Sequence, residues 1–278
     1  MAILPLAPGE TIGILGGGQL GRMLAQAASR LGFDVAILEP APDAPAGRVA
    51  AHTVRGAYDD PRALEALAAV ASLVTFEFEN VPAGAVAHLT DQDVEVAPNA
   101  RALAVAQDRV EEKSFLNSIG VPTVAFAAAD SPQAAEAAMA LIGAPALMKT
   151  RREGYDGKGQ RWVEHAAEAA AVFESLGGKP VIIEAPADFV RELSVIAARG
   201  RDGELAIYPM AENHHENGVL RRSVAPAAVS AGLAQQAERI AAQVLTGLDY
   251  VGVIGIELFE LSDGRLLVNE IAPRVHNT

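Results

Sequence analysis

Cysteine is absent from this 278-residue chain, so disulfide bonds and thiolate metal sites are excluded. Aromatic residues make up only 5% of the sequence while half of its residues are apolar, which predicts an aliphatic, alanine-rich core. No apolar run approaches the roughly 20 residues that a transmembrane helix needs. The first residues lack the charged start and the cleavage site of a secretory signal. These absences predict a cytoplasmic protein that has no membrane partner.

Positive charge is also scarce, because 22 Lys and Arg residues face 35 Asp and Glu residues and leave a formal net charge of −13. A protein that binds nucleic acid usually carries the opposite balance. Nucleic acid is therefore not expected as a partner. The cations that are present cluster in the sequence, which favours a small anionic ligand over a polymer.

The densest cluster of cations lies in residues 149–160, where two Lys, two Arg and three Gly occur within twelve residues. The apolar residues on either side predict a strand, a turn and a returning strand. Glycine permits φ > 0, and consecutive backbone N–H groups in such a turn form an anion-binding concavity. Lys149, at the end of the first strand, adds a positive charge at a fixed place. We interpret the segment as a loop that closes over nucleotide phosphates; the alternative is a solvated basic hairpin.

A second glycine-rich turn lies near the start of the chain, at residues 16–21. A strand precedes it, a helix follows it, and residues 35–39 form a second strand, which together make a βαβ unit. The turn matches Gly-x-Gly-x-x-Gly, and Glu39 follows at the distance expected of a ribose-binding acid. Taken alone, this match suggests a nicotinamide or flavin cofactor. The alternative is a tight strand-to-helix turn that requires glycine.

The α/β pattern continues to about residue 98, where Pro98 and Asn99 indicate a domain boundary. A strand predicted at residues 72–77 leads into Glu77 and Glu79. Open α/β sheets bind their ligands at the carboxyl ends of the strands. Residues 1–98 are therefore predicted to form a Rossmann-like domain with acids at its binding edge.

Two more domains are predicted, a small α+β domain at residues 99–184 that carries the glycine-rich loop as its mobile edge, and an α+β domain at residues 185–278. Their expected elements are a polar-faced helix at 109–119, a strand at 123–126, helices at 131–142 and 166–176, a strand at 180–184, two strands within 191–208, a polar loop at 212–218 and a helix at 230–248. The whole chain is thus expected to be α/β in class.

The last predicted element is a hairpin that turns at residues 262–265. If the turn takes four residues, Leu261 faces Leu266, and Glu257 then lies directly opposite Glu270. Facing carboxylates repel each other, and lone carboxylates among apolar neighbours are costly. A divalent cation relieves both problems, and oxygen ligands favour Mg²⁺. The alternative is a register shifted by one residue, with one of the two acids in solvent.

These features together resemble the ATP-grasp superfamily, which implies an N-terminal Rossmann-like (pre-ATP-grasp) domain, a small α+β lid domain and a C-terminal catalytic domain. Within it, the sequence is similar to the N5-carboxyaminoimidazole ribonucleotide synthetases. The matching strings are Gly-Gly-Gly-Gln-Leu-Gly-Arg-Met-Leu at 16–24, Gly-Tyr-Asp-Gly-Lys-Gly-Gln at 154–160, Tyr-Val-Gly-Val at 250–253 and Asn-Glu-Ile-Ala-Pro-Arg-Val-His-Asn at 269–277. The resemblance spans essentially the whole chain, and the second and fourth strings are specific.

The resemblance implies a site for ATP and Mg²⁺. Its phosphate contacts would be Arg109, Lys149 and the loop residues Gly154, Tyr155, Asp156, Gly157, Lys158, Gly159 and Gln160. Its remaining nucleotide contacts would be Glu184, Ala185, Pro186 and Ala187 at the adenine, Glu192 at the ribose, and His215, Asn269 and Glu270. Glu257 and Glu270 would hold the metal.

The resemblance also implies the second substrate, 5-aminoimidazole ribonucleotide, and its contacts, Gln19, Leu20, Glu77, Tyr155 and Lys158. Bicarbonate and the carboxyphosphate made from it would be held by Arg274, His276 and Asn277. Bicarbonate is a poor electrophile, so ATP would activate it, with the metal and the cations neutralising charge on the transferring phosphoryl group. The loop would exclude water from the short-lived carboxyphosphate. The resemblance also implies a homodimer.

The family continues past the position of Asn277 into a segment with cations for the ribonucleotide phosphate, whereas this sequence stops at Thr278. We expect a chain that ends there to keep the ATP site and to bind the second substrate poorly. Three other functions stay open at this point: another ATP-grasp ligase of the formate-dependent transformylase or carboxylase type, an NAD-binding oxidoreductase, and a nucleotide-binding protein without catalytic activity.

Overall fold

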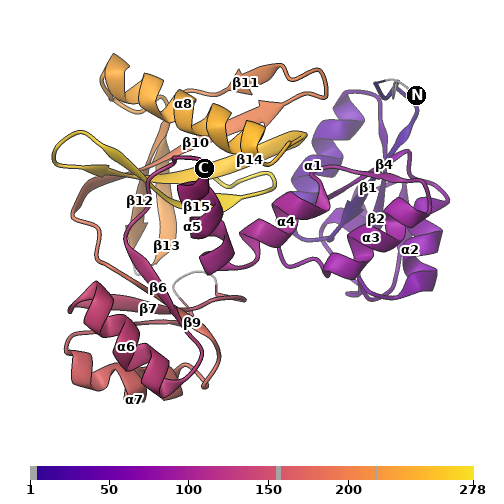
Figure 1. Ribbon diagram of the computed structural model, residues 1–278. Helices are drawn as coiled ribbons and strands as arrows, with labels where there is room; N and C mark the ends of the chain where they lie inside the picture. The colour runs from indigo at the N-terminus through magenta and orange to yellow at the C-terminus, as the bar shows by residue number, and fades with distance from the viewer. Residues whose placement is uncertain (1–4, 155–157, 217) are drawn as a thin grey trace. The chain divides into compact units, whose positions relative to one another are not determined.

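The computed structural model describes residues 5–154, 158–216 and 218–278, which divide into two compact units (Figure 1). The first unit contains the chain up to Ala104 together with residues 249–253 and 273–277. The second contains residues 105–248 and 254–272. None of the helices in the described ranges combines the length and the apolar character that a bilayer crossing demands.

The first unit is built on a parallel five-stranded sheet with the order β3-β2-β1-β4-β5. Its strands are β1 (Thr11–Leu15), β2 (Asp34–Leu38), β3 (His52–Val54), β4 (Leu73–Phe76) and β5 (Glu95–Val96). Its helices are α1 (Gln19–Arg30), the 3-10 turn η1 (Ala46–Arg48), α2 (Pro61–Ala68), α3 (Ala83–Asp91) and the start of α4 (Ala100–Ala106). The predicted Rossmann-like arrangement is confirmed.

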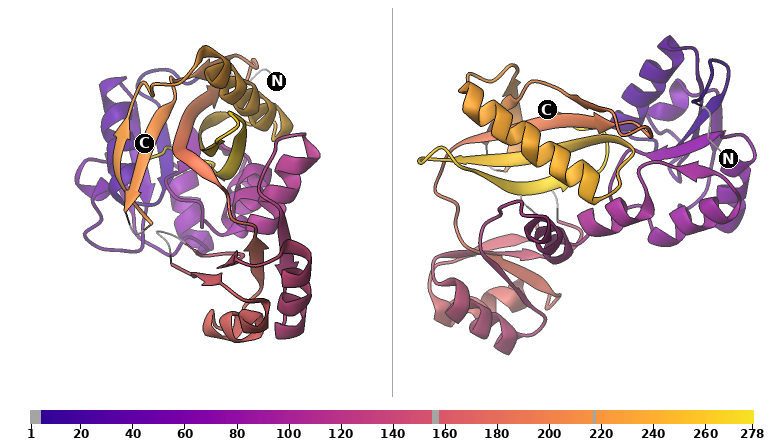
Figure 2. Two further views of the ribbon diagram at one scale, coloured as in Figure 1. Left: turned by 90° about the vertical axis from the view of Figure 1, so that its left-hand side faces the viewer. Right: turned by 45° about the horizontal axis from the view of Figure 1, so that its top comes forward.

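Both faces of this sheet are covered, which is why its strands are continuous apolar runs. Ile14 packs on the side of α1, whereas its neighbour Leu15 packs on the side of α2 and α3. Successive side chains of a strand alternate between faces, so each strand supplies both cores. The two layers of helices are visible in Figure 1 and in the right-hand view of Figure 2.

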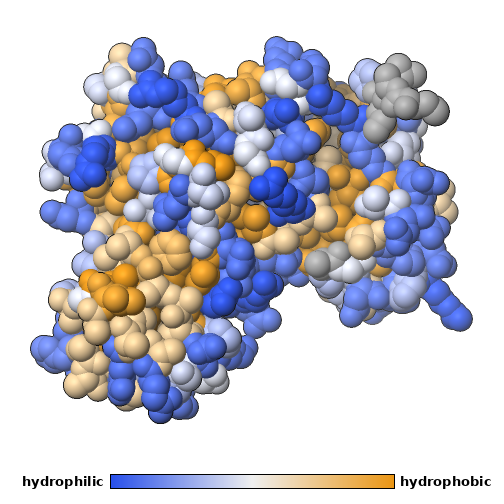
Figure 3. Space-filling model, viewed as in Figure 1, coloured by the Kyte–Doolittle hydropathy of each residue, from blue (hydrophilic) through white to orange (hydrophobic). Residues whose placement is uncertain are grey.

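The second unit contains a four-stranded antiparallel sheet with the order β6-β9-β7-β8. Its elements are β6 (Phe126–Ala129), α6 (Pro132–Ile142), β7 (Ala146–Thr150), β8 (Gln160–Val163), η2 (Ala166–Glu168), α7 (Ala169–Ser175) and β9 (Val181–Glu184). Helices α6 and α7 bury Met139 and Phe173 against Met148 and Ile183. The outer surface over these helices is alanine-rich and carries the exposed Leu141, and it has the pale orange of weakly apolar residues in Figure 3.

The other sheet of this unit has the order β13-β12-β10-β14-β15, with β11 paired to β10. Its strands are β10 (Phe189–Arg199), β11 (Leu205–Ile207), β12 (Ala211–Glu216), β13 (Val219–Val224), β14 (Gly252–Leu261) and β15 (Leu266–Ala272). Two helices pack on it, α5 (Arg109–Ser118) beside β15 and α8 (Ala231–Gly247) across β10, β11 and β15. Helix α8 begins at Ser230, whose Oγ accepts a hydrogen bond from Leu233 N, and it buries Leu233, Ile240 and Val244.

The structure corrects two predicted segments. Residues 212–218 are predicted to be a polar loop, but residues 212–216 belong to β12, which pairs with β13 in antiparallel fashion. The side chains of β12 are mostly polar, so no hydrophobic alternation marks this strand in the sequence. The strand predicted at 123–126 lies at Phe126–Ala129 instead.

The three sheets occupy residues 11–96, 126–184 and 189–272. The domain boundaries proposed after residues 98 and 184 stay predictions.

Candidate active site

Lys149 and Glu184 meet on the face of the four-stranded sheet that α6 and α7 leave open. Ala146 and Met148 point into the helical core, so the alternation of β7 turns Lys149 the other way. Its Nζ lies 2.6 Å from Glu184 Oε2, and Lys113 Nζ lies 3.4 Å from Glu184 Oε1. Burial opposes the charged form of Glu184, but the two ammonium groups outweigh it and lower the pKa of this carboxyl. Lys149 and Glu184, two of the predicted nucleotide contacts, are therefore in direct contact.

Arg109 joins the glycine-rich loop to β15. Its Nη1 donates to Glu270 Oε2 at 3.1 Å, and its Nη2 donates to the carbonyl of Gly154 at 3.0 Å. Burial opposes the charge of Glu270, but Arg109, Lys149 and Lys113 outweigh it and lower the pKa of this carboxyl. The predicted loop and the predicted metal acid therefore share one guanidinium.

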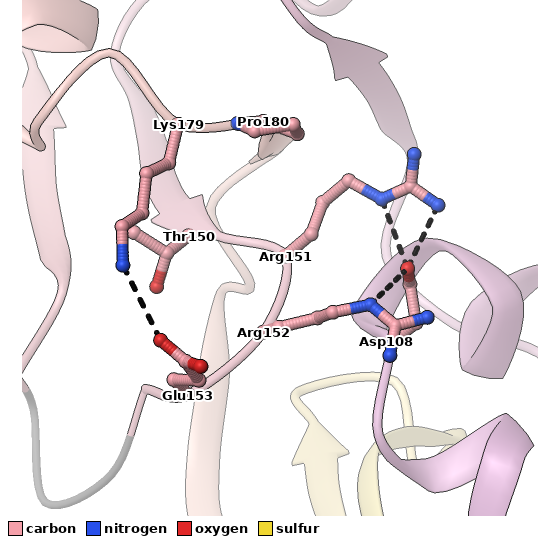
Figure 4. Close-up of a pocket in the computed structure, with 7 residues that line it drawn as sticks. All are labelled: Asp108, Thr150, Arg151, Arg152, Glu153, Lys179 and Pro180. Carbon is pink, nitrogen blue, oxygen red and sulfur yellow. Dashed lines mark hydrogen bonds and ion pairs between the residues drawn. The ribbon is translucent and has the colours of Figure 1, made fainter. Parts of the chain in front are cut away.

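Asp108 fixes the start of α5, where Arg109 is the first residue (Figure 4). Its carboxylate accepts hydrogen bonds from Val110 N, from Arg151 Nε and Nη2 at 3.0 and 2.9 Å, and from Arg152 Nε at 3.2 Å. The backbone N–H of Arg109 also donates to the carbonyl of Arg151. Asp108 thereby ties the start of the helix to the base of the glycine-rich loop.

A cavity of about 360 Å³ opens beside this cluster. Its lining residues are Asp108, Thr150, Arg151, Arg152, Glu153, Lys179 and Pro180 (Figure 4). Each of the three cations in that lining has a carboxylate partner, since Lys179 Nζ lies 3.3 Å from Glu153 Oε2 and the two arginines pair with Asp108. The cavity thus lies at the base of the loop, where two arginines share the single carboxylate of Asp108 and Lys179 pairs with Glu153.

The glycine-rich loop is described at its two ends. Gly159 has a φ of +72°, and a Cβ there would lie 2.8 Å from Thr150 Oγ1, so this position requires glycine. Its carbonyl accepts a hydrogen bond from Thr150 N at 2.8 Å. Lys158 and Gln160 are exposed. The predicted contacts Tyr155, Asp156 and Gly157 lie outside the described residues.

The hairpin places Glu257 opposite Glu270, as predicted, but by a different route. The predicted pairing of Leu261 with Leu266 is wrong, because Glu260 faces Leu266. A β-bulge between Glu257 and Leu258 then shifts the register by one residue and restores the facing acids. The extra residue of the bulge is Asn269, whose Nδ2 lies 3.4 Å from Glu257 Oε2.

This acidic pair fits a magnesium ion that is shared with a nucleotide. Glu257 and Glu270 occupy facing positions, and the side chain of Asn269 contacts the carboxylate of Glu257. Within the described ranges there is no group of three or more acids, histidines or cysteines that would enclose a metal unaided. Mg²⁺ commonly binds one or two carboxylates and takes its other ligands from water and substrate phosphates. The two carboxylates of Glu257 and Glu270 match this coordination preference.

Glu192 and His215 form a second pair on this sheet, and the Nδ1 of His215 lies 2.6 Å from Glu192 Oε2. They come from neighbouring strands, because β10 pairs with β12 at Glu192 and Asn213. Burial raises the pKa of Glu192 and the charge of Glu257 adds to that effect, whereas His215 opposes it. The predicted ribose contact therefore lies within electrostatic reach of the predicted metal ligand.

The segment that joins the two sheets of the second unit contains Ala185, Pro186 and Ala187. Ala185 N donates to the carbonyl of Ala125 at 2.9 Å, which holds the segment at the end of β9. Pro186 is exposed, and the residues on either side of it are half-buried. The segment is thus next to Glu184 along the chain, as an adenine hinge requires.

The first unit holds the other predicted substrate contacts. Gln19 and Leu20 open α1, and Glu77 follows β4. Both oxygens of Glu77 accept hydrogen bonds from the first glycine-rich turn, one from Gly18 N and one from Gly21 N. Glu77 therefore shapes this turn from the adjacent strand.

The string at 273–277 also belongs to the first unit. Arg274 Nε donates to Glu79 Oε2 at 2.5 Å, and its Nη1 donates to the carbonyl of Val275. His276 is half-buried and Asn277 is exposed. Glu79 thus orients the guanidinium that was predicted to hold bicarbonate.

Sequence reasoning missed three charged residues of the site, Asp108, Glu112 and Lys113. Asp108 has a local signal, because an aspartate before a helix is a typical N-cap. Glu112 and Lys113 have none, since charged residues within a polar helix are expected to face solvent, yet they are 2% and 1% exposed. Burial and Glu270 raise the pKa of Glu112 to about 8, although Lys113 opposes this.

Two family models match the chain, the ATP-grasp domain over residues 114–278 and the ribonucleotide synthetase preATP-grasp domain over residues 9–107. The N5-carboxyaminoimidazole ribonucleotide synthase of Brucella melitensis is 48% identical over 275 residues, which cover 98% of this chain and 76% of the relative.

Solved structures agree with these matches. An ADP complex of an N5-carboxyaminoimidazole ribonucleotide synthetase superposes with a TM-score of 0.93 at 35% identity, over 98% of this chain and 72% of that one. The Aspergillus clavatus N5-carboxyaminoimidazole synthase, in complex with ADP and 5-aminoimidazole ribonucleotide, gives a TM-score of 0.89 at 30% identity, over 97% and 71%.

Proposed function

Because this chain belongs to the N5-carboxyaminoimidazole ribonucleotide synthase family of ATP-grasp proteins, we propose that it carboxylates 5-aminoimidazole ribonucleotide with ATP and bicarbonate, as a ligase of purine biosynthesis. The observation that carries this proposal is the bridge made by Arg109 between Gly154 of the glycine-rich loop and Glu270 of the acidic hairpin. A phosphate-covering loop and a metal-binding pair belong together in an enzyme that transfers a phosphoryl group.

In the first half-reaction, bicarbonate oxygen attacks the γ-phosphorus of ATP and releases ADP, which yields carboxyphosphate. Arg109 and Lys149 hold the phosphates, with Gly154, Lys158, Gly159 and Gln160 and the rest of the loop over them. Glu257 and Glu270, with Asn269 beside them, would hold Mg²⁺, which would supply positive charge to neutralise the transferring phosphoryl group. Glu184 to Ala187 contact the adenine, and Glu192 with His215 contacts the ribose.

In the second half-reaction, the exocyclic amine of the ribonucleotide attacks the carboxyl carbon, the C–O bond to phosphate breaks, and the amine loses a proton. Gln19, Leu20 and Glu77 contact the ribonucleotide. Arg274, His276 and Asn277 hold the carboxyphosphate, and the Glu79 carboxylate supports this role because it fixes Arg274. Tyr155 and Lys158 complete the contacts from the loop.

We also propose that the protein is a cytoplasmic homodimer. The absence of cysteine and the dependence on ATP and a purine precursor support a cytoplasmic location. The dimer is supported by family likeness alone, and sedimentation equilibrium over a range of concentrations tests it.

The test of the activity is release of ADP by the full-length protein, with any segment that follows Thr278 included. We expect release to require bicarbonate and 5-aminoimidazole ribonucleotide together, and we expect calorimetric heat with Mg-ATP and none with NADH. The control is Glu136→Gln on the outer face of α6, which should match the unaltered protein. ADP release that ignores the ribonucleotide would contradict the substrate assignment, and heat with NADH alone would favour an oxidoreductase.

A further inference from the structure

Two backbone groups of β15 that flank Glu270 hydrogen-bond to side chains of α5. The carbonyl of Asn269 accepts from Lys113 Nζ at 2.9 Å, and Ile271 N donates to Glu112 Oε1 at 2.7 Å. Asn269 is the extra residue of the β-bulge, and a bulge interrupts the ladder at the place where it occurs. Strand β15 is also the last strand in the order β13-β12-β10-β14-β15, so its outward backbone groups have no neighbouring strand to bond. Buried backbone groups without a strand partner need other partners. The helix supplies them.

The two side chains that do this are ionisable and almost fully buried, with 2% of Glu112 and 1% of Lys113 exposed. Burying a charge is costly, and a buried ion pair rarely exceeds well-packed apolar residues in stability. Lys113 has a second partner in Glu184, at 3.4 Å. An apolar pair at these positions would fill the space but would leave both backbone groups without partners. The arrangement is therefore better explained by what it holds than by net stabilisation.

The bulge decides which way Glu270 points. At the tip of the hairpin Glu260 faces Leu266, and an unbroken ladder from there would place Asn269 opposite Glu257 and Glu270 opposite Ile256. Ile256 is fully buried in the core of this sheet. Because facing residues share a side of the sheet, Glu270 would then leave the side of Glu257. The one extra residue therefore decides whether Glu270 lies on the same side of the sheet as Glu257.

We propose that Glu112 and Lys113 are positioning residues that hold the bulge of β15, so that Glu270 and Asn269 both serve the metal-bound nucleotide. The same helix grips the carboxylate itself through Arg109, whose Nη1 lies 3.1 Å from Glu270 Oε2. Helix α5 therefore controls the backbone before and after Glu270 as well as its side chain. This inference rests on the proposed function, which assigns Mg²⁺ to Glu257 and Glu270.

The test compares ADP affinity in Mg²⁺ with ADP affinity in EDTA, by calorimetry. Lys113→Met removes the donor to Asn269, and Glu112→Leu removes the acceptor for Ile271. We expect each change to reduce the gain in affinity that Mg²⁺ provides by tenfold or more, the size typical of lost support around a metal ligand. Affinity in EDTA should change by less than about threefold for Glu112→Leu, which is well under the roughly 1.4 kcal/mol of a tenfold change. Lys113→Met also removes a partner of Glu184, so its loss of affinity in Mg²⁺ should exceed its loss in EDTA.

Two variants sharpen the comparison. Glu112→Gln keeps an oxygen for Ile271 N and should recover most of the Mg²⁺ effect that Glu112→Leu loses. Glu111→Gln, the exposed neighbour on the same helix, should match the unaltered protein in both buffers. Equal losses in Mg²⁺ and in EDTA would assign the pair a merely structural role, and unchanged affinities would overturn the proposal outright.

A measurement on the unaltered protein covers the case in which a variant does not fold. Amide exchange at Ile271, without nucleotide or metal, should be as slow as exchange in the centre of β14. Fast exchange there would overturn the proposed clamp. If the unaltered protein shows no effect of Mg²⁺ on ADP affinity, the assigned metal pair fails, and the exchange result alone then decides whether α5 holds the bulge.

Discussion

Asp108 shows how much one carboxylate can organise in this protein. Its side chain is 4% exposed, caps α5 and forms ion pairs with both Arg151 and Arg152. Burial opposes its charge, but Arg151 and the N–H groups of the helix outweigh it and lower the pKa of Asp108. Hydrogen bonds to charged groups contribute about 1.5–3 kcal/mol each, so this carboxylate is a large local contribution to stability.

We predict that Asp108→Asn lowers the free energy of unfolding by about 2 kcal/mol at pH 7, because the cap oxygen remains while the charge is lost. A carboxyl whose pKa is lowered on folding stabilises above its ordinary pKa and loses this effect as the pH falls through the folded value. The difference between the two proteins should therefore shrink below about pH 4, the region of the ordinary pKa of 3.8. Urea unfolding between pH 3 and pH 7 measures it.

The exposed Asp130, changed to Asn, is the matched control and should show a small difference at every pH. A constant deficit of Asp108→Asn from pH 3 to pH 7 would contradict the electrostatic explanation.

The prediction that Glu257 lies opposite Glu270 is confirmed, although the pairing predicted next to the turn, Leu261 with Leu266, is wrong. The shift at the tip and the shift at Asn269 cancel, and neither is written in the hydrophobic pattern. Glu112 and Lys113 were not predictable, because periodicity reports which faces are apolar and cannot reveal a buried charge whose partner is remote in sequence. The ion pairs of Lys149 and Arg109 needed the fold to bring strands and helix together.

Among the elements, the β1–α1 turn gives the clearest contrast between motif and structure. Gly17 N donates to Glu39 Oε2 at 2.7 Å, while Gly18 N and Gly21 N donate to Glu77. In dinucleotide-binding turns this region approaches a pyrophosphate. Here two carboxylates of the chain take these N–H groups, which argues against the nicotinamide interpretation of the motif.

We predict that Gly18→Ala destabilises the first unit by about 1–3 kcal/mol, the usual cost of overpacking. A Cβ at this position would lie 2.5 Å from Glu77 Oε1 and would push the carboxylate off the turn. The matched control is Gly84→Ala in α3, where a Cβ meets nothing within 4 Å and helix propensity favours alanine. Urea unfolding compares them, and equal stabilities would refute the close approach of Glu77.

Element boundaries show where pattern reasoning works and where it stops. Helix α8 follows apolar periodicity because one side of it is core. The strands of the first sheet are recognisable as continuous apolar runs because both faces of that sheet are covered. The pattern predicts a loop where β12 lies, because polar residues such as Asn213 and His215 line this strand. A strand lined by polar side chains lacks the signal that an apolar strand provides.

For the whole molecule, the two units divide the proposed chemistry. Every described residue assigned to ATP or Mg²⁺ belongs to the second unit, whereas Gln19, Glu77 and Arg274 belong to the first. The class of fold was predictable from alternating strands and helices and from four strings in order. The division into two units was not, because residues 249–253 and 273–277 return to the first unit from a distant part of the sequence.

We predict that Mg-ADP stabilises the second unit in particular. A ligand at 100 times its dissociation constant adds about 2.7 kcal/mol to the free energy of unfolding of the part that binds it. Scanning calorimetry with amide exchange should show slower opening of residues 181–199 and 254–272, with residues 11–38 changing less. Mg-AMP, which lacks the second phosphate, is the control and should give a smaller effect. Protection gained chiefly at residues 11–38 would contradict the assignment.

The bulge at Asn269 also separates the acidic pair from the tip of its hairpin. Residues 262–265, at the tip, are exposed. The paired segments 258–260 and 266–268 lie between this tip and the bulge, and the two acids lie beyond the bulge. Exposed loop tips are the sites at which folded proteins best accept inserted sequence. This tip is therefore the natural place to graft a fluorophore-binding peptide or a purification handle while leaving the alignment of the two acids intact.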